Sequence, residues 1–237
     1  IAIVGGGISG AIIGLTLAKE GREVTIIERR GPAEGSTIAS TAMIQFEIDT
    51  PLTELADKIG NEKAMRAYRR SLRAVGDLGN LVAEHAPAAR WQDREALYLA
   101  GNEMGFRALR KEADARARAG LPSRYLDRDE VQNLFGIDTT GAILSKGAAD
   151  LDPVATAVSF LRAAQKLGAK VISPCEIESI EPASPLGGVR LRTREGHLIS
   201  CRKAIFATGY EVIGGVPRSA FDIVSSWAIA TQPLAPD

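Results

Sequence analysis

The sequence is poor in the residues from which metal sites and covalent cross-links are built. Its 237 residues include two cysteines and two histidines. Cys175 and Cys201 are far apart in the chain, and neither belongs to a metal-ligand spacing. We therefore expect no metal site. Sparse cysteine is typical of a protein in a reducing compartment, so we expect a cytoplasmic location.

The sequence also lacks an excess of charge of either sign and any long hydrophobic run. Lys and Arg number 29, as do Asp and Glu, so the net charge is zero. Nothing in this balance favours a nucleic-acid partner. No stretch approaches the ~18 consecutive apolar residues of a membrane span, so we expect no integral membrane segment. The apolar share of 45% is ordinary for a globular protein of one large domain or two intertwined ones.

A glycine-rich turn follows the first residues. Ile1–Val4 is a short apolar run typical of a strand buried on both faces. Gly5, Gly7 and Gly10 then fill the G-x-G-x-x-G pattern of dinucleotide-binding turns. The first glycine permits the tight turn, the second lets the backbone approach a pyrophosphate, and the third lets the next helix pack closely. The pyrophosphate would lie at the N-terminus of that helix, where N–H groups are unpaired.

An acidic residue follows at the distance that this pattern requires. Glu23–Glu28 reads as a second strand, and Glu28 ends it eighteen positions after Gly10. A carboxylate there accepts hydrogen bonds from a ribose diol. Arg29 and Arg30 would suit the 2′-phosphate of NADP, but Glu28 would repel that phosphate. We expect the two arginines to flank the adenosine or to face solvent.

Three later features favour FAD over NAD. After Glu28 the chain enters a stretch of small and hydroxyl-bearing residues, 35–42. Such a stretch can run close under a flat ring and its phosphates. It can equally form a helix cap followed by a polar loop. A strand–helix pattern returns late, with a helix beginning at Asp152-Pro153 and a strand over residues 169–172. Residues 203–206 read as a strand that ends in Ala207, Thr208 and Gly209, small enough for close approach to a cofactor.

The order and spacing of these segments resemble the FAD-dependent amine oxidoreductases of the D-amino-acid oxidase, glycine oxidase and sarcosine oxidase family. The resemblance rests on Gly5–Gly10, Glu28-Arg29, the stretch 35–43, Asp152-Pro153, Cys175–Ile177 and Ala207–Gly209. It implies that Glu28 holds the adenosine ribose and that the backbone of Ile177 reads the adenine. The remaining cofactor-binding residues that it implies are Gly5, Gly7, Ile8, Ser9, Gly10, Arg29, Ser36, Thr37, Ser40, Thr41, Ala42, Met43, Ala207, Thr208 and Gly209. The family usually has glycine near Ala42.

The same resemblance implies an α/β fold in which a Rossmann-like FAD-binding domain of the GR2 flavoprotein type is interleaved with an α+β substrate domain. Residues 1–45 and 149–216 would form the FAD-binding domain, and residues 46–148 and 217–237 parts of the substrate domain. We expect helices over residues 51–59, 61–85, 102–119 and 129–135, and strands over 96–100, 142–144 and 222–231. Because family members run further, we expect the C-terminal part of the fold to be missing from this chain.

For such an enzyme we expect oxidation of the C–N bond of an amino acid or secondary amine by hydride transfer to the flavin N5. The partners would be a small-molecule amine or amino acid and dioxygen or another electron acceptor. No catalytic acid or base stands out; Tyr98, Gln45 and Trp227 are candidate pocket liners, and His85 reads as a helix-end residue. The alternatives are a flavin dehydrogenase of a hydroxy substrate such as glycerol phosphate, a non-catalytic dinucleotide-binding module, and an NAD(P)-linked dehydrogenase.

Overall fold

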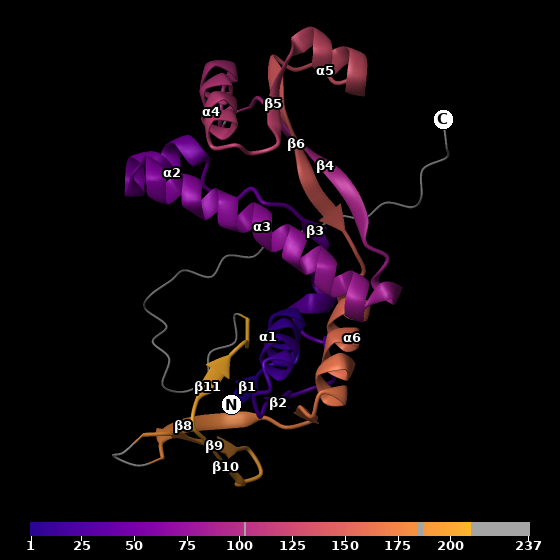
Figure 1. Ribbon diagram of the computed structural model, residues 1–237, viewed down its shortest axis with the longest axis vertical. Coiled ribbons are helices and arrows are strands. Elements are labelled where there is room, and N and C mark those ends of the chain that lie inside the picture. The colour runs from indigo at the N-terminus through magenta and orange to yellow at the C-terminus, as the bar shows by residue number, and fades with distance from the viewer. Residues whose placement is uncertain (102, 184–186, 210–237) are drawn as a thin grey trace. The chain divides into compact units, whose positions relative to one another are not determined.

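A computed structural model of the chain describes residues 1–101, 103–183 and 187–209 (Figure 1). The described residues separate into two compact units. The first combines residues 1–41 with the described residues from 153 onward, and the second comprises residues 42–152. Each unit is described below by itself.

The first unit is built on a four-stranded parallel sheet in the order β11-β1-β2-β7. Its strands are β1 (Ala2–Val4), β2 (Thr25–Ile27), β7 (Lys170–Ile172) and β11 (Ala204–Phe206). Ile3 and Ile26, on the two central strands, are fully buried. Burial on both faces explains why these strands read as continuous apolar runs in the sequence.

Two helices pack against each other beside this sheet, α1 (Ile8–Lys19) and α6 (Pro153–Lys166) (Figure 1). A β-carbon placed on Gly14 of α1 would lie 2.6 Å from Cδ1 of Ile26, so α1 approaches the sheet more closely than any side chain there would allow. An antiparallel meander completes the unit: β8 (Ile177–Pro182), β9 (Val189–Thr193) and β10 (Leu198–Cys201). Its buried Ile177 and Leu191 share a hydrophobic cluster with Val4 and Ile27 of the parallel sheet.

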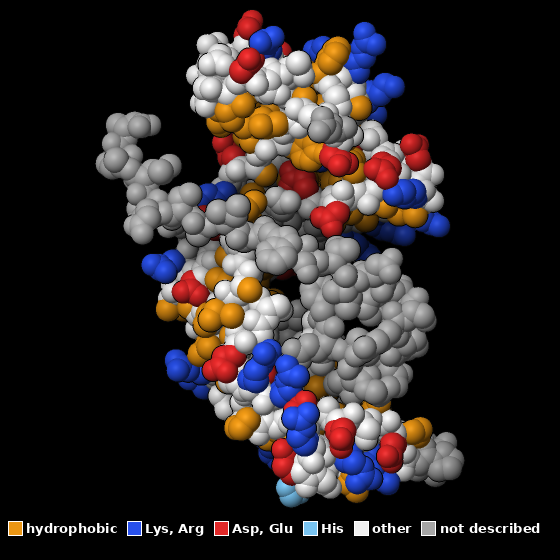
Figure 2. All heavy atoms as spheres, turned by 180° about the vertical axis from the view of Figure 1, so that it is seen from behind, with side chains coloured by type: hydrophobic (Ala, Val, Ile, Leu, Met, Phe, Trp, Pro, Cys, Tyr) orange, Lys and Arg blue, Asp and Glu red, His pale blue; other side chains and the backbone are white. Residues whose placement is uncertain are grey.

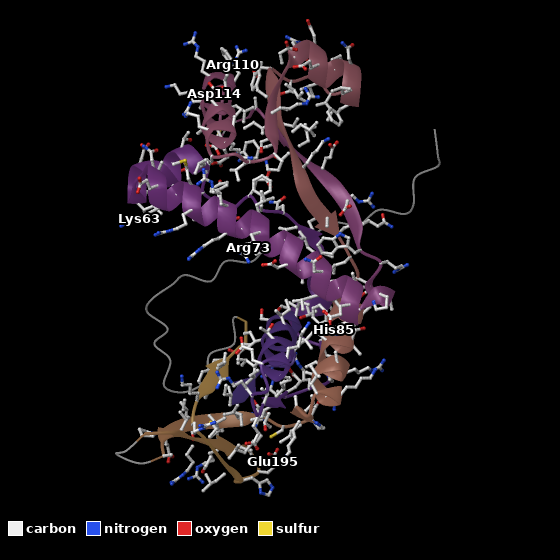
Figure 3. All side chains as sticks on the ribbon, viewed as in Figure 1. Lys63, Arg73, His85, Arg110, Asp114 and Glu195 are labelled. Carbon is white, nitrogen blue, oxygen red and sulfur yellow. The ribbon has the colours of Figure 1, made fainter. Side chains whose placement is uncertain are left out.

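The second unit contains an antiparallel sheet in the order β3-β6-β4, with β5 also paired to β6. Its strands are β3 (Met43–Ile44), β4 (Gln92–Leu99), β5 (Ser123–Asp127) and β6 (Gly141–Asp150). Its helices are α2 (Leu52–Ile59), α3 (Asn61–His85), α4 (Phe106–Arg118) and α5 (Arg128–Phe135), with a short 3-10 turn, η2 (Pro87–Ala89), after α3. Labelled His85 marks the end of α3, as expected from the sequence (Figure 3).

The sequence predicted the helices of this unit better than its strands. The expected strand over 96–100 begins earlier, at Gln92, because the residues that precede it pair with β6 although their side chains are exposed. β6 is longer than the expected segment 142–144, and β5 was not expected as a strand. Strand pairing, rather than a buried apolar run, extends these elements.

A buried ion pair on α4 connects this helix to the start of α2 and to the segment that holds Glu47. The Glu112 carboxylate of α4 accepts hydrogen bonds from the backbone N–H groups of Leu52 and Thr53, both at 2.8 Å, and so closes the N-terminus of α2. Arg116 donates to Glu112 at 2.8 Å and to Glu47 at 3.2 Å. Burial opposes ionisation of Glu112, but these hydrogen bonds outweigh it and hold the pKa of its carboxyl below the ordinary value.

The guanidinium of Arg116 also lies 5.8 Å from the ring centre of Tyr68, whose hydroxyl donates to the carbonyl of Thr50 at 2.9 Å. Burial raises the pKa of Tyr68 to about 12, against the opposing effect of Arg116. The cluster therefore combines a neutral tyrosine with an ionised Glu–Arg pair. Because the cluster is buried, we assign it a structural role.

The surface carries both signs of charge. Figure 2 shows Lys and Arg interspersed with Asp and Glu over the described part of one face. Within the described residues, no helix has both the length and the apolar character needed to cross a membrane.

Candidate functional site

The first unit holds a pocket of about 420 Å³ at the carboxyl ends of its central parallel strands. In open parallel sheets this is the edge at which ligands bind. The pocket is lined by Val4, Gly5, Gly7, Ile27, Glu28, Arg29, Arg30, Gly35, Ser36, Thr37, Cys175, Glu176, Ile177, Glu178, Arg194, Ala207, Thr208 and Gly209. Segments that are far apart in the sequence thus meet around one cavity.

The glycine turn leaves no room for side chains. Gly5 has a φ of +113°, and a β-carbon there would lie 2.3 Å from the carbonyl oxygen of Ala207. A β-carbon on Gly10 would lie 1.9 Å from the carbonyl oxygen of Gly5, and one on Gly7 would lie 2.9 Å from Oγ1 of Thr37. The pocket wall at the start of α1 is therefore backbone, and backbone N–H groups at a helix N-terminus bind anionic groups such as a pyrophosphate.

Glu28 directly follows β2, and its carboxylate faces this turn. Its Oε2 accepts a hydrogen bond from the N–H of Gly6 at 2.6 Å, and its Oε1 accepts one from the N–H of Arg30 at 2.8 Å. Each carboxylate oxygen has a second lone-pair direction. The two backbone donors therefore fix the carboxylate while leaving it able to accept further hydrogen bonds from a diol.

The η1 turn (Ser36–Ala39) forms the neighbouring wall. The Thr37 hydroxyl is buried and accepts a hydrogen bond from the N–H of Ile8 at 3.0 Å, which attaches η1 to the first turn of α1. The N–H of Ala207 donates to the carbonyl of Val4 at 2.8 Å and brings the end of β11 beside the glycine turn. The small residues that follow β11 thus line the pocket, and their close approach to a cofactor stays a prediction.

Charged side chains also line the pocket, on the segments next to Ile177 and Glu28. Glu176 lies between two arginines, with Arg194 Nη1 at 2.6 Å from one carboxylate oxygen and Arg29 Nη1 at 3.8 Å from the other. Cys175 lies beside them, and its N–H donates to the carbonyl of Glu28 at 2.7 Å. Burial, and secondarily the negative charge of Glu195, raises the pKa of the Cys175 thiol. Figure 3 labels Glu195 in the turn between β9 and β10.

Ten of the residues expected to bind the cofactor line this pocket: Gly5, Gly7, Glu28, Arg29, Ser36, Thr37, Ile177, Ala207, Thr208 and Gly209. Ile8 and Gly10 contribute through the backbone of the turn, since one donates to Thr37 and the other lets α1 approach Gly5. The side chains of Ser9, Ser40 and Thr41 are exposed and do not line it. Their roles stay predictions.

Ala42 and Met43 belong to the second unit. Ala42 has a φ of 60°, a backbone conformation that favours glycine, which gives a physical reason for the glycine expected near this position. Tyr98 and Gln45 also lie in the second unit and are exposed, while Trp227 lies outside the described residues.

Sequence reasoning missed Glu178 and Arg194 as pocket-lining residues. Arg194 follows Arg190 and Arg192 at alternating positions of a strand and its end, so the pattern does not distinguish it from the other two. Its role in the pocket depends on strand register, which pairs Thr193 with Ile177.

These residues fit FAD. A side-chain-free cradle at a helix N-terminus suits a diphosphate, and an anchored carboxylate next to it suits a ribose diol. The hydroxyls of η1 and the small residues after β11 add neutral contacts along the same cavity.

Comparison with known proteins agrees with this site. Residues 1–236 match the family described as FAD dependent oxidoreductase, DAO. A curated relative from Bacillus subtilis (strain 168), named as a Rieske 2Fe-2S iron-sulfur protein, YhfW, is 24% identical over 98% of this chain and 45% of its own length. The chain thus spans about half the length of this relative.

Solved structures show the same fold. The L-proline dehydrogenase from P. horikoshii has a TM-score of 0.69 at 21% identity, over 87% of this chain and 52% of that one. The glycine oxidase from Bacillus cereus ATCC 14579 has a TM-score of 0.67 at 22% identity, over 87% and 54%. The L-α-glycerophosphate oxidase from Mycoplasma pneumoniae has a TM-score of 0.63 at 18% identity, over 86% and 51%.

The family match and these structures confirm the α/β flavoprotein fold and FAD as the cofactor. With the glycine turn, the anchored Glu28 and the match over residues 1–236 all in agreement, the chain belongs to the FAD dependent oxidoreductase family.

Proposed function

We propose that the protein oxidises the C–N bond of an amino acid or a secondary amine with FAD. The observation that carries the proposal is the pocket of the first unit, in which a backbone cradle and the anchored Glu28 lie together. We assign FAD binding to residues 1–45 and 149–216 and substrate binding to residues 46–148 and 217–237. We also propose a cytoplasmic location, because cysteine is sparse.

In this proposal the chain holds the cofactor and orients the substrate, and the bound cofactor supplies the redox chemistry. The N–H of Gly7 would face the diphosphate, while the N–H of Ile8 holds Thr37 beside it. Glu28 would accept hydrogen bonds from the ribose, and the backbone of Ile177 would contact the adenine. Ser36 and the residues after β11 line the path between them. When bound, FAD supplies the hydride acceptor at its flavin N5. The absence of a clear acid or base in the sequence agrees with a reaction in which the protein mainly orients a neutral amine.

The substrate class is supported by the names of similar structures. A proline dehydrogenase and a glycine oxidase both act on the amine carbon of an amino acid, and both share this fold. The main alternative is oxidation of a hydroxy substrate, since an L-α-glycerophosphate oxidase shares the fold too. The electron acceptor that we propose is dioxygen or another acceptor. The name of the B. subtilis relative refers to an iron–sulfur centre in that protein.

The test is anaerobic reduction of the purified protein. Its visible spectrum is recorded first, and glycine, sarcosine, proline and D- and L-alanine are then added separately, with sn-glycerol 3-phosphate as the hydroxy competitor. Loss of the flavin absorbance band with an amine alone supports the proposal. Loss with glycerol phosphate alone favours the hydroxy substrate. A flavin band that no compound reduces favours a non-catalytic module, and a protein that purifies without a yellow chromophore and takes up none favours a nicotinamide cofactor.

A further inference from the structure

Three segments place charged side chains in the part of the pocket that Ile177 lines. Arg29 follows β2, Glu176 precedes β8, and Arg194 follows β9. All three line the cavity next to Ile177. Neither the glycine turn nor Glu28 requires this group, so it calls for an explanation of its own.

Arg194 is held at two points by the same residue. Its backbone N–H donates to the carbonyl of Glu176 at 2.9 Å, and its Nη1 lies 2.6 Å from the Glu176 carboxylate. The pairing of Thr193 with Ile177 fixes the backbone on both sides of this contact. A guanidinium is planar, so attachment at one edge restricts the orientation of its face.

Coulomb attraction alone does not explain the arrangement. The side chain of Arg194 is 68% exposed, and an ion pair with that exposure contributes little to stability. The Glu176 side chain, at 23% exposure, also faces Arg29 at 3.8 Å, so its charge is shared between two cations. What the group provides is a planar cation, held by Glu176, among the residues that line the cavity.

We propose that Arg194, oriented by Glu176, stacks on the adenine of bound FAD and thereby makes the site selective for the adenine-containing dinucleotide over flavins that lack it. The inference rests on the proposed FAD site and adds a binding residue to it. Guanidinium planes stack on nucleobases, and the face of a base attracts a cation. Arg194 is therefore a binding residue, and Glu176 is a positioning residue that acts through it.

The test measures ligand binding by apo-protein of the full chain. Wild type, Arg194→Ala, Arg194→Lys and Glu176→Gln are each titrated with FAD, ADP and FMN by isothermal titration calorimetry. The matched control is Arg22→Ala, because Arg22 is similarly exposed at 61% and also faces a carboxylate, that of Glu20 at 3.9 Å, but lies outside the pocket. Thermal unfolding of each variant reports whether it is folded.

We expect Arg194→Ala to weaken FAD and ADP by the same factor, roughly 5- to 150-fold, which is the range for loss of one stacked base. Arg194→Lys should weaken them nearly as much, because lysine keeps the charge and loses the plane. FMN lacks the adenine, so we expect it to bind weakly to wild type and to be unaffected by the substitution. Glu176→Gln should show a smaller loss, and Arg22→Ala none.

Three results would overturn the inference while leaving the FAD site intact: unchanged FAD and ADP affinity in a folded Arg194→Ala protein, full recovery by lysine, or a loss that includes FMN equally. A wild-type protein that binds neither FAD nor ADP would instead contradict the proposed function itself. If Arg194→Ala fails to fold, the lysine variant carries the same comparison.

Discussion

Each unit contains a carboxylate that accepts hydrogen bonds from two backbone N–H groups, yet the two carboxylates have different roles. Glu28 anchors to Gly6 and Arg30 beside an open pocket, where its remaining lone pairs face a ligand site. Glu112 anchors to Leu52 and Thr53, is fully buried, and fills its remaining capacity with Arg116 and the Thr53 hydroxyl. Anchoring alone therefore does not mark a binding site; what distinguishes the two is whether acceptor capacity remains on an accessible side.

This comparison makes opposite predictions for the two units. Changes around Glu28 should affect cofactor affinity more than stability. Changes around Glu112 should affect stability and leave the affinity of the folded protein unchanged. The predictions below run from the largest expected effect to the smallest.

Gly10→Ala should abolish FAD binding. Its β-carbon would meet the carbonyl oxygen of Gly5 at 1.9 Å, so α1 or the glycine turn has to move. FAD retention on purification and calorimetric titration measure the effect. The control is Gly76→Ala in α3, where a β-carbon meets nothing within 4 Å and alanine favours the helix by about 1 kcal/mol. Normal FAD binding by Gly10→Ala would show that the cradle does not hold the diphosphate.

Glu112→Ala should lower the free energy of unfolding by about 3–5 kcal/mol, because it leaves Arg116 buried without its main partner and Leu52 and Thr53 without an acceptor. Urea denaturation measures this loss. Glu54→Ala, which removes an exposed pair with Lys58, should change stability by less than about 1 kcal/mol. Equal losses of unfolding free energy in the two variants would contradict the predicted difference between the buried and the exposed carboxylate.

Glu28→Gln should weaken FAD by roughly 10- to 150-fold, the effect of losing charge-assisted hydrogen bonds worth about 1.5–3 kcal/mol. The amide also turns an NH₂ group toward one of the two backbone donors, so a modest loss of stability accompanies it. Calorimetric titration with FAD measures affinity, and Glu181→Gln, on β8 but outside the pocket, is the control. A large stability loss with unchanged affinity would place Glu28 in the same class as Glu112.

Acidification should destabilise the protein partly through Glu112. Its pKa in the folded state lies below the ordinary value, so its contribution to stability is complete above the unfolded pKa and is lost as pH falls through the folded pKa. Urea midpoints measured from neutral pH to the acid range of carboxyl titration should fall more steeply for wild type than for Glu112→Ala. If the urea midpoints of the two proteins fall equally with pH, then folding does not lower the pKa of Glu112.

Local sequence predicted the cofactor turn well because its constraints are local. Gly5, Gly7 and Gly10 each avoid a nearby clash, and Glu28 directly follows the next strand. The limits of α3 were also predictable from the sequence, because helical periodicity is a local pattern that continues up to His85.

Features that depend on distant segments were not predictable. Glu112 and Arg116 have the i, i+4 spacing of an exposed helix pair, and their burial follows from the packing of α4 against the start of α2. Arg194 becomes a pocket residue through its register against Glu176, which the alternating arginines of β9 do not encode. β5 lacks a strong apolar run and exists as a strand through its pairing with β6.

The glycine turn has a consequence for how this site tolerates mutation. Because main-chain atoms make its wall, the side chain of Ser9 between the glycines is exposed and not part of that wall. The three glycines are the reverse case, since one extra methyl group on any of them intrudes on a neighbouring atom. The three glycine positions of the turn are therefore limited by volume, whereas Glu28 beside them is limited by charge.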